Sequence, residues 1–145
     1  MSSTPRALSP LGSALRAYLD ARSSALLAAR KALGINELDA RAFVHILENP
    51  GIRPVEVKNV FGLTSAGVTV LIDRLVERDV VRRDPDPEDR RSVRLVATID
   101  LGDSPWAALT SFDDGFEAAV LELEDGESDS SVELITRLTR LAGDR

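Results

Sequence analysis

The chain has 145 residues, a formal net charge of −6 and no cysteine. This length suits one domain that buries a single hydrophobic core. The absence of cysteine excludes disulfides, thiolate metal sites and thiol redox chemistry. The apolar stretches are interrupted by charged residues and fall far below the roughly 18 residues of a membrane span, and no signal peptide is recognisable. We therefore expect a cytoplasmic protein with no membrane partner.

The charge is unevenly distributed along the chain. Residues 53–94 carry nine Lys or Arg against eight Asp or Glu, a net charge of +1, whereas residues 100–145 carry three Arg against twelve acids, a net charge of −9. A negative total argues against a nucleic-acid partner. A local basic face can still act, because salt screens charges beyond about 10 Å. Nucleic-acid binding therefore stays open for the middle of the chain.

The first third of the chain has the periodicity of helices. Residues 1–12 are rich in Ser, Thr, Pro and Gly, and we expect them to start as a loose arm. Over residues 11–33 apolar side chains recur at three- and four-residue steps, which predicts a long amphipathic helix ended by Gly34. Asn36 is expected to cap a second helix, which stops at the Asn-Pro-Gly of residues 49–51.

The middle of the chain predicts two short helices and a hairpin. The first helix covers residues 54–61 and is closed by Gly62, and the second is an amphipathic run over residues 66–78. Two such helices joined by a glycine-containing turn are typical of a helix-turn-helix. The period then changes to 2, which predicts strands at residues 80–83 and 92–98 joined by a long charged loop.

The last third predicts two further helices. Ser104 and Pro105 are expected to start a helix that runs to about Leu123. A polar break at residues 124–127 follows, and a last helix from Ser130 or Ser131 runs through Leu141. No internal repeat is present.

Catalytic chemistry lacks its usual parts in this sequence. His45 is the only histidine and there is no cysteine, which excludes a catalytic triad, a Cys–His pair and a multi-histidine metal site. The acids of residues 84–89 resemble a calcium loop superficially, but the central Gly and the terminal Glu are missing. We expect no catalytic residue, no metal and no cofactor. For His45 we expect a role in packing or between subunits.

The start of the run at residues 66–78 has the composition of a DNA recognition helix. Small side chains at a helix N-terminus allow its axis to approach base edges in the major groove. The candidates lie off the apolar stripe, and they are Thr64, Ser65, Ala66, Gly67 and Thr69. A structural role also fits part of this set, because Thr64 and Ser65 can cap the helix and Gly67 can relieve crowding.

Two arginines are expected at the tip of the hairpin. Arg90 and Arg91 can enter a narrow minor groove there and neutralise phosphates. Alternatively they pair with neighbouring acids and fix the loop. Both roles can hold, with one arginine supporting the loop and the other contacting DNA.

These residues resemble a known family. The stretch from Gly62 to Arg78, the Val-Val-Arg-Arg at residues 80–83 and the Asp-Pro-Glu-Asp-Arg-Arg-Ser at residues 86–92 closely resemble the MarR family of transcriptional regulators. The run at residues 86–92 is the most specific part, and a weaker resemblance extends over residues 11–100. The resemblance implies a homodimer with intertwined first and last helices. It also implies that two winged-helix lobes read adjacent major grooves of a near-palindromic site in double-stranded DNA.

The resemblance suggests roles for individual residues. It implies that Asp86 and Asp89 brace the wing, Asp89 by pairing with an arginine, and that Arg90 reaches the minor groove. We further expect three basic residues to help hold phosphates, and they are Arg53, Lys58 and Arg74.

The chain departs from the family pattern at three places. Val70 occupies a DNA-facing position where the family commonly has an arginine, so that one expected DNA contact is missing. Asp79 stands where a glycine usually ends the recognition helix. Residues 99–103 replace the usual helix start after the second strand.

A ligand cavity is a further expectation, because many relatives bind small aromatic molecules between their dimerisation and DNA-binding regions. The residues expected to line it are Tyr18, His45, Trp106 and Phe112. Plain core or dimer packing is the alternative for these aromatic side chains.

Together these features predict a winged helix-turn-helix protein, mainly α with a small β-hairpin. We expect an N-terminal arm and dimerisation helix (residues 1–33), a DNA-binding domain (34–98) and C-terminal dimerisation helices (99–145). The expected function is that of a non-enzymatic, sequence-specific transcriptional regulator, a repressor that a small-molecule effector can release. The alternative is a protein-interaction module of the same fold that has lost specific DNA binding, because Val70 and the acidic C-terminal segment weaken DNA contacts.

Overall fold

The computed structural model of the chain describes residues 7–102, 104–124 and 126–143. Their elements, in chain order, are α1 (Pro10–Leu33), α2 (Glu37–Glu48), α3 (Pro54–Phe61), α4 (Ser65–Glu77), β1 (Val81–Pro85), β2 (Val93–Ala97), the 3₁₀ helix η1 (Pro105–Leu109), α5 (Ser111–Val120) and α6 (Glu127–Gly143). The chain divides into two compact units, Met1–Thr110 and Ser111–Arg145. The predicted fold class, mainly α with a small β-hairpin, is confirmed.

Local capping signals set the ends of the first helices. Ser9 begins α1, where its hydroxyl accepts a hydrogen bond from the Gly12 N–H at 3.1 Å. Gly34 ends α1 with φ 61° and Gly62 ends α3 with φ 62°, a left-handed conformation that glycine adopts at no steric cost. Asn36 caps α2, because its side-chain oxygen accepts from the backbone N–H of Asp39 at 2.8 Å.

The end of α4 is built without glycine. Asp79 takes the left-handed conformation there, with φ 58°, although most residues with a Cβ avoid it. The Thr98 hydroxyl donates to the Asp79 carbonyl at 2.5 Å, and the Thr98 N–H donates to the Val80 carbonyl at 3.0 Å. The departure noted in the sequence therefore leaves the turn intact but places an aspartate in a strained position.

The hairpin is tied to the helices through its second strand. β1 and β2 pair antiparallel from Val81 opposite Ala97 to Pro85 opposite Val93. The segment before α3 adds a bridge, in which the Leu95 N–H donates to the Ile52 carbonyl at 2.8 Å. Because this bridge precedes α3 directly, the start of the helix-turn-helix and the hairpin share one backbone network.

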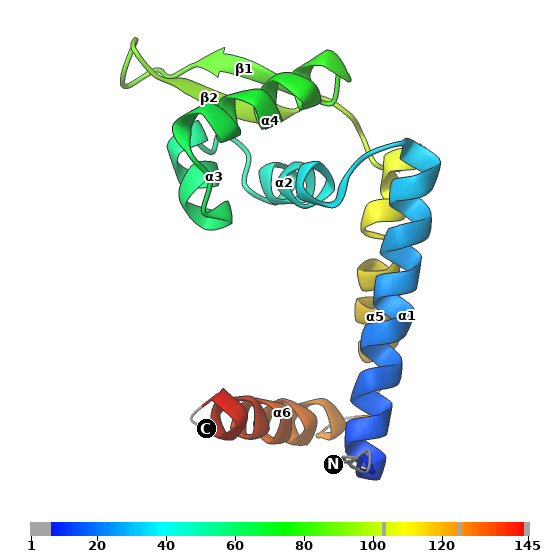
Figure 1. Ribbon diagram of the computed structural model, residues 1–145. Coiled ribbons are helices and arrows are strands. Elements are labelled where there is room, and N and C mark those ends of the chain that lie inside the picture. The colour runs from blue at the N-terminus through cyan, green and yellow to red at the C-terminus, as the bar shows by residue number, and fades with distance from the viewer. Residues whose placement is uncertain (1–6, 103, 125, 144–145) are drawn as a thin grey trace, which may run out of the picture. The chain divides into compact units, whose positions relative to one another are not determined.

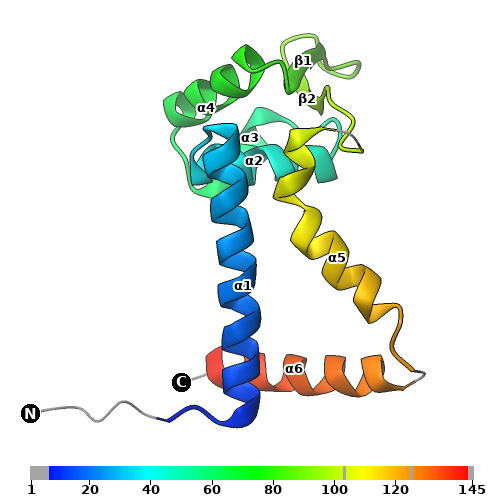
Figure 2. The same ribbon diagram turned by 90° about the vertical axis from the view of Figure 1, so that its right-hand side faces the viewer.

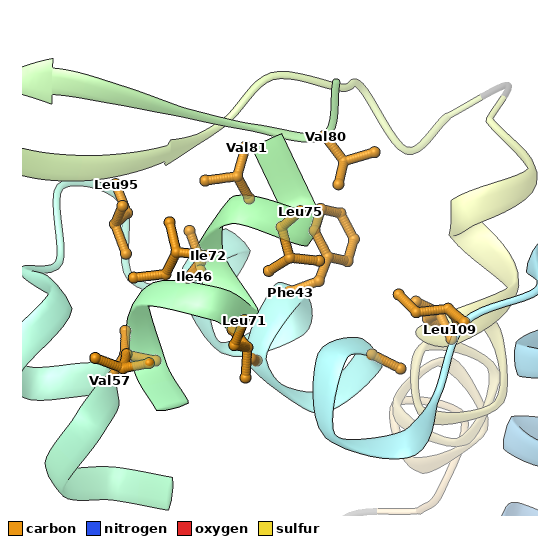
Figure 3. Close-up of a cluster of buried hydrophobic side chains, with 14 of the residues drawn as sticks. Phe43, Ile46, Val57, Leu71, Ile72, Leu75, Val80, Val81, Leu95 and Leu109 are labelled. Atoms are coloured by element: carbon orange, nitrogen blue, oxygen red, sulfur yellow. The ribbon is translucent and has the colours of Figure 1, made fainter. Parts of the chain in front are cut away.

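A single hydrophobic core lies beneath α4 and the hairpin (Figure 3). It forms because the apolar stripe of α4 faces α2 and the strands, as the periodicity predicts. Its largest fully buried apolar side chains are Phe43, Ile46, Val57, Leu71, Ile72, Leu75, Val80, Val81 and Leu95. Deleting any of these would leave a cavity in a region that holds α4 in place.

Within the first unit, α4 and the hairpin lie on one side of α2 and α3 (Figures 1 and 2). The loop of the hairpin is at the end farthest from α1 (Figure 1). η1 packs against α1. The outward surface of α4 and the hairpin loop are therefore on the part of this unit that α1 leaves uncovered.

The structure corrects two predictions for the C-terminal third. The continuous helix from Pro105 to Leu123 is wrong, because η1 and α5 are separate elements and α5 ends at Val120. The Thr110 N–H donates to the carbonyl of Ala107, three residues back, at 3.1 Å, so that the chain closes a 3₁₀ turn before α5 begins. The last helix begins at Glu127 rather than at Ser130 or Ser131.

The second unit has many exposed apolar side chains. Neither α5 nor α6 buries a residue. The exposed large apolar residues of this unit are Phe116, Leu121, Leu123, Val132, Leu134, Ile135, Leu138 and Leu141. An exposed apolar set of this size is typical of an interaction surface.

Among the described residues, no single helix is long and apolar enough to cross a membrane, although α3 and α4 taken together, bent by 112°, reach that length and composition.

Candidate nucleic-acid interface

The outward surface at the start of α4 carries the predicted DNA-facing residues. Thr64 is the N-cap of α4 and its hydroxyl accepts from the Gly67 N–H at 3.0 Å. A Cβ at Gly67 would lie 3.1 Å from that hydroxyl oxygen, which explains why glycine suits this position. The other predicted side chains are exposed, and they are Ser65, Ala66, Thr69 and Val70.

Two arginines attach the later turns of α4 to neighbouring elements. Asp73, one turn beyond Val70, pairs with Arg83 of β1 at 2.5 Å, so that the recognition helix is linked to the hairpin. Arg78 donates to the carbonyls of Leu33 and Gly34 at 3.1 and 2.6 Å, which attaches the end of α4 to the end of α1.

Arg74 has an internal partner that the sequence did not indicate. Its Nε donates to Asp39 Oδ2 at 2.7 Å and its Nη2 lies 2.5 Å from Asp39 Oδ1. The Asp39 side chain is only 4% exposed, and Asn36 Nδ2 also donates to it at 2.9 Å. The hydrogen bond to Asp39 raises the pKa of Arg74. Arg74 therefore anchors α4 on α2.

We call the hairpin of residues 81–97 the wing. Asp86 is the centre of a cluster of ion pairs at the base of this wing. Its side chain is fully buried, and Arg53 Nε and Nη2 both lie 2.7 Å from its Oδ2. Arg94 Nη2 lies 3.2 Å from Oδ1, and the Glu88 N–H donates to the same oxygen at 3.0 Å. Arg53, which we expected on a phosphate, thus spans from the start of α3 to the wing.

These contacts set the ionisation of the wing base. The Glu88 N–H, and after it the guanidinium of Arg53, hold the pKa of Asp86 below its ordinary value of 3.8, although burial opposes this. The same hydrogen bond raises the pKa of Arg53. Asp86 is therefore a carboxylate at neutral pH and joins the wing to α3.

Asp89 has a different role from the one that the resemblance implies. Its Oδ1 accepts a hydrogen bond from the backbone N–H of Arg91 at 2.9 Å, and its carbonyl accepts from the Ser92 N–H at 2.9 Å. The expected ion pair of Asp89 with an arginine is not formed within the described part of the chain. Asp89 shapes the turn, whereas Asp86 holds the arginines.

The wing tip, residues 87–91, carries two cations that have no acidic partner among the described residues. Arg90 and Arg91 are both exposed, and neither forms an ion pair within residues 7–102. Lys58, on α3, is half-buried and likewise forms no ion pair there. The arginines at the base of the wing are held by acids, and the charge that faces outward is therefore concentrated at the tip.

Two of the four predicted cavity residues pack against an aromatic ring of the first unit. The ring of His45 meets Phe61 edge-on, with ring centroids 5.7 Å apart, and Trp106 meets Phe43 at 4.9 Å. Tyr18 is half-buried on α1, and Phe112 is half-buried on α5 in the second unit. Packing accounts for His45 and Trp106, and a cavity lined by all four remains a prediction.

Sequence reasoning missed Asp39 and Arg94. Asp39 lies in the first turn of α2, where any acid suits the helix dipole, and nothing local indicates a partner for it. Its partner Arg74 lies 35 residues away. Arg94 sits in an alternating strand, and nothing local indicates that it turns back toward Asp86. Within the described residues, no group of three or more His, Asp or Glu could hold a metal ion.

This arrangement of α3, α4 and a two-stranded wing is a winged helix-turn-helix. Residues 33–92 match the family model described as MarR family. A comparison of the sequence with curated proteins gives no match.

Solved structures share this fold. A mutant of MarR from E. coli is 23% identical, with a TM-score of 0.59 over 92% of this chain and 99% of that one. A transcriptional regulator from Thermotoga maritima is 23% identical, with a TM-score of 0.57 over 89% and 93%. A mutant of MepR from S. aureus, bound to an oligodeoxyribonucleotide, is 16% identical, with a TM-score of 0.59 over 94% and 99%. Residues 33–92 of this chain are therefore similar to the MarR family, and the solved structures share its fold.

Proposed function

We propose that this chain is a transcriptional regulator that binds double-stranded DNA as a homodimer. In each protomer, α4 enters the major groove through Ser65, Ala66, Thr69 and Val70, and the wing tip places Arg90 and Arg91 at the adjacent minor groove or phosphates. The MepR structure bound to an oligodeoxyribonucleotide and an operator complex of E. coli MarR support DNA as the ligand of this surface.

One observation carries the proposal. Asp39, Asp73 and Asp86 hold the arginine of α4 and two arginines of the hairpin strands, together with Arg53. Arg90 and Arg91 are exposed at the wing tip and form no ion pair within the described residues. An exposed arginine that forms no ion pair with an acid of the protein can neutralise a phosphate or enter a narrow minor groove.

Binding to duplex DNA at two salt concentrations tests this proposal. Duplexes selected by the protein from a random-sequence pool, and the fragment upstream of its own gene, are labelled and titrated by fluorescence anisotropy. We expect salt-sensitive binding that Arg90→Ala weakens and makes less dependent on salt. The exposed Arg140→Ala on α6 is the matched control and leaves both unchanged. No salt-sensitive complex at micromolar protein refutes the proposal and favours an interaction module without DNA binding.

The homodimer is proposed from the open apolar side chains of α6. Ile135 is 45% exposed and Leu138 is 36% exposed, and burial against a second copy would remove both from water. We expect Ile135→Glu with Leu138→Glu to convert the dimer to a monomer in light scattering. A dimer that survives this double change would place the interface elsewhere.

Repression and release by an effector complete the proposal. We expect the protein to lower expression from a reporter that carries its selected duplex in the promoter. A panel of small aromatic compounds then tests whether any of them restores expression and weakens binding in vitro. Activation of the reporter, or no response to any compound, would contradict the corresponding part of the proposal.

A further inference from the structure

The outward surface of α4 combines an exposed valine with hydroxyls that already have backbone partners. The Thr69 hydroxyl donates to the Ser65 carbonyl at 2.9 Å, and the Thr64 hydroxyl accepts from the Gly67 N–H. The Thr69 hydroxyl therefore keeps only acceptor capacity, and its methyl group adds to the apolar surface. Ala66 and Val70 contribute no hydrogen-bonding side-chain group at all.

Val70 is 52% exposed although it belongs to a helix whose other large aliphatic residues are mostly covered. Ala66 precedes it by four residues, so that the two side chains lie on one face, one turn apart. The next residue on that face is Asp73, which is held by Arg83 of the hairpin. The apolar part of the face is therefore confined to the first two turns of α4.

The major groove offers one apolar group on its base edges, the C5-methyl group of thymine. The other groups on those edges are hydrogen-bond donors and acceptors, which a valine side chain would desolvate without replacing their hydrogen bonds. A valine that enters the groove at this position therefore stabilises the complex when it contacts the thymine methyl group. It destabilises the complex when it contacts the polar edge of cytosine.

We propose that Val70, with Ala66 beside it, is a specificity-determining residue that contacts thymine C5-methyl groups in the major groove. This inference rests on the proposed DNA-binding function and adds the base that the recognition helix selects. It predicts that each half-site contains at least one thymine whose methyl group is needed for full affinity.

Removal of single methyl groups from the DNA tests the inference directly. In a duplex selected by the protein, each thymine is replaced in turn by uracil, which differs only in the missing C5-methyl group. We expect about four-fold weaker binding at one or more positions in each half-site, the ratio that corresponds to about 0.8 kcal/mol for one methyl-sized group. Thymines outside the stretch of duplex that the bound protein covers serve as the DNA control.

A double-mutant cycle assigns the effect to Val70. Val70→Ala should weaken binding to the thymine duplex and should make the protein insensitive to uracil at the same positions, because the contact is already lost. Val60→Ala is the matched protein control, since Val60 is an exposed valine, 58% exposed, on α3. It should leave the sensitivity to uracil unchanged.

The outcomes separate the two proposals. Binding that changes less than two-fold with uracil at every position refutes this inference and leaves DNA binding intact. An equal effect of uracil in the wild type and in Val70→Ala assigns the methyl contact to another residue and also overturns it. A chain that binds no duplex refutes the proposed function and this inference together.

Discussion

The pair between Arg74 and Asp39 predicts an asymmetric response to mutation. Arg74→Ala leaves the carboxylate of Asp39 without its cation in a site where the aspartate side chain is only 4% exposed. Asp39→Ala instead leaves Arg74, whose side chain is 40% exposed and can be solvated again. The first change should therefore be the more destabilising one.

The magnitudes follow from burial. Removing one partner of a fully buried pair typically costs about 3–5 kcal/mol, and water reaches the exposed part of this arginine, so we expect roughly 2–3 kcal/mol for Arg74→Ala. For Asp39→Ala we expect about 1 kcal/mol, because the arginine exchanges its hydrogen bonds for water. The Asn36 oxygen still caps α2 in both variants.

Urea unfolding followed by Trp106 fluorescence measures both changes. Trp106 is the only tryptophan and packs edge-on against Phe43 in the core, with ring centroids 4.9 Å apart. All variants are compared at one protein concentration, because the stability of a dimer depends on it. Arg82→Ala, which removes an exposed pair with Asp84, is the control and should change the midpoint little. A larger loss for Asp39→Ala than for Arg74→Ala would refute this account of the pair.

Three further predictions follow from the wing and the core. The fold depresses the pKa of Asp86, so the ionised side chain stabilises the fold above pH 3.8 and this stabilisation is lost as the pH falls below that value. Asp86→Asn should cause the same loss at neutral pH, measured as faster tryptic cleavage at the wing tip. Asp84→Asn is the control and should leave the cleavage rate unchanged. Phe43→Ala should destabilise the core by about 3–5 kcal/mol in urea unfolding, because Phe43 is fully buried. Asp79→Gly should raise stability by roughly 0.5–1 kcal/mol, because glycine accepts the positive φ that aspartate holds under strain and keeps the backbone hydrogen bonds of residue 79. An unchanged midpoint would contradict strain at this position.

Most of the fold was predictable because the residues that begin and end its helices act within one helical turn. Gly34, Asn36, Gly62 and Thr64 act through their own backbone or through residues three positions away, so that their roles can be read from neighbouring residues. The apolar stripe of α4 likewise predicts which face is buried. The 3₁₀ turn at Thr110 was missed, because its hydrogen bond to Ala107 differs by only one residue from that of an α-helix.

The roles of the arginines were not predictable in the same way. Arg53 and Arg74 reach acids 33 and 35 residues away, and no local pattern distinguishes an arginine that will meet a distant acid from one that will face a phosphate. The exposure of Arg90 and Arg91 was expected, because a Pro-rich polar loop between two strands projects into solvent. Ion pairs formed only in the folded structure thus distinguish the arginines that anchor one element to another from the exposed arginines without an acidic partner.

This separation predicts how steeply DNA binding depends on salt. In the helix-turn-helix and wing, within the described residues, Lys58, Arg90 and Arg91 are cations that form no ion pair with an acid and no hydrogen bond to a carbonyl. Each phosphate that a cation neutralises adds about −0.9 to the slope of log K against log salt, so that three per protomer give a slope of about −5 for a dimer. A slope near −10 in anisotropy titrations would mean that Arg53, Arg74 or other anchored arginines leave their acids for phosphates. Such an exchange would have to break the contacts that hold α4 and the wing, and the measured slope therefore tests whether this surface binds DNA in the conformation described above.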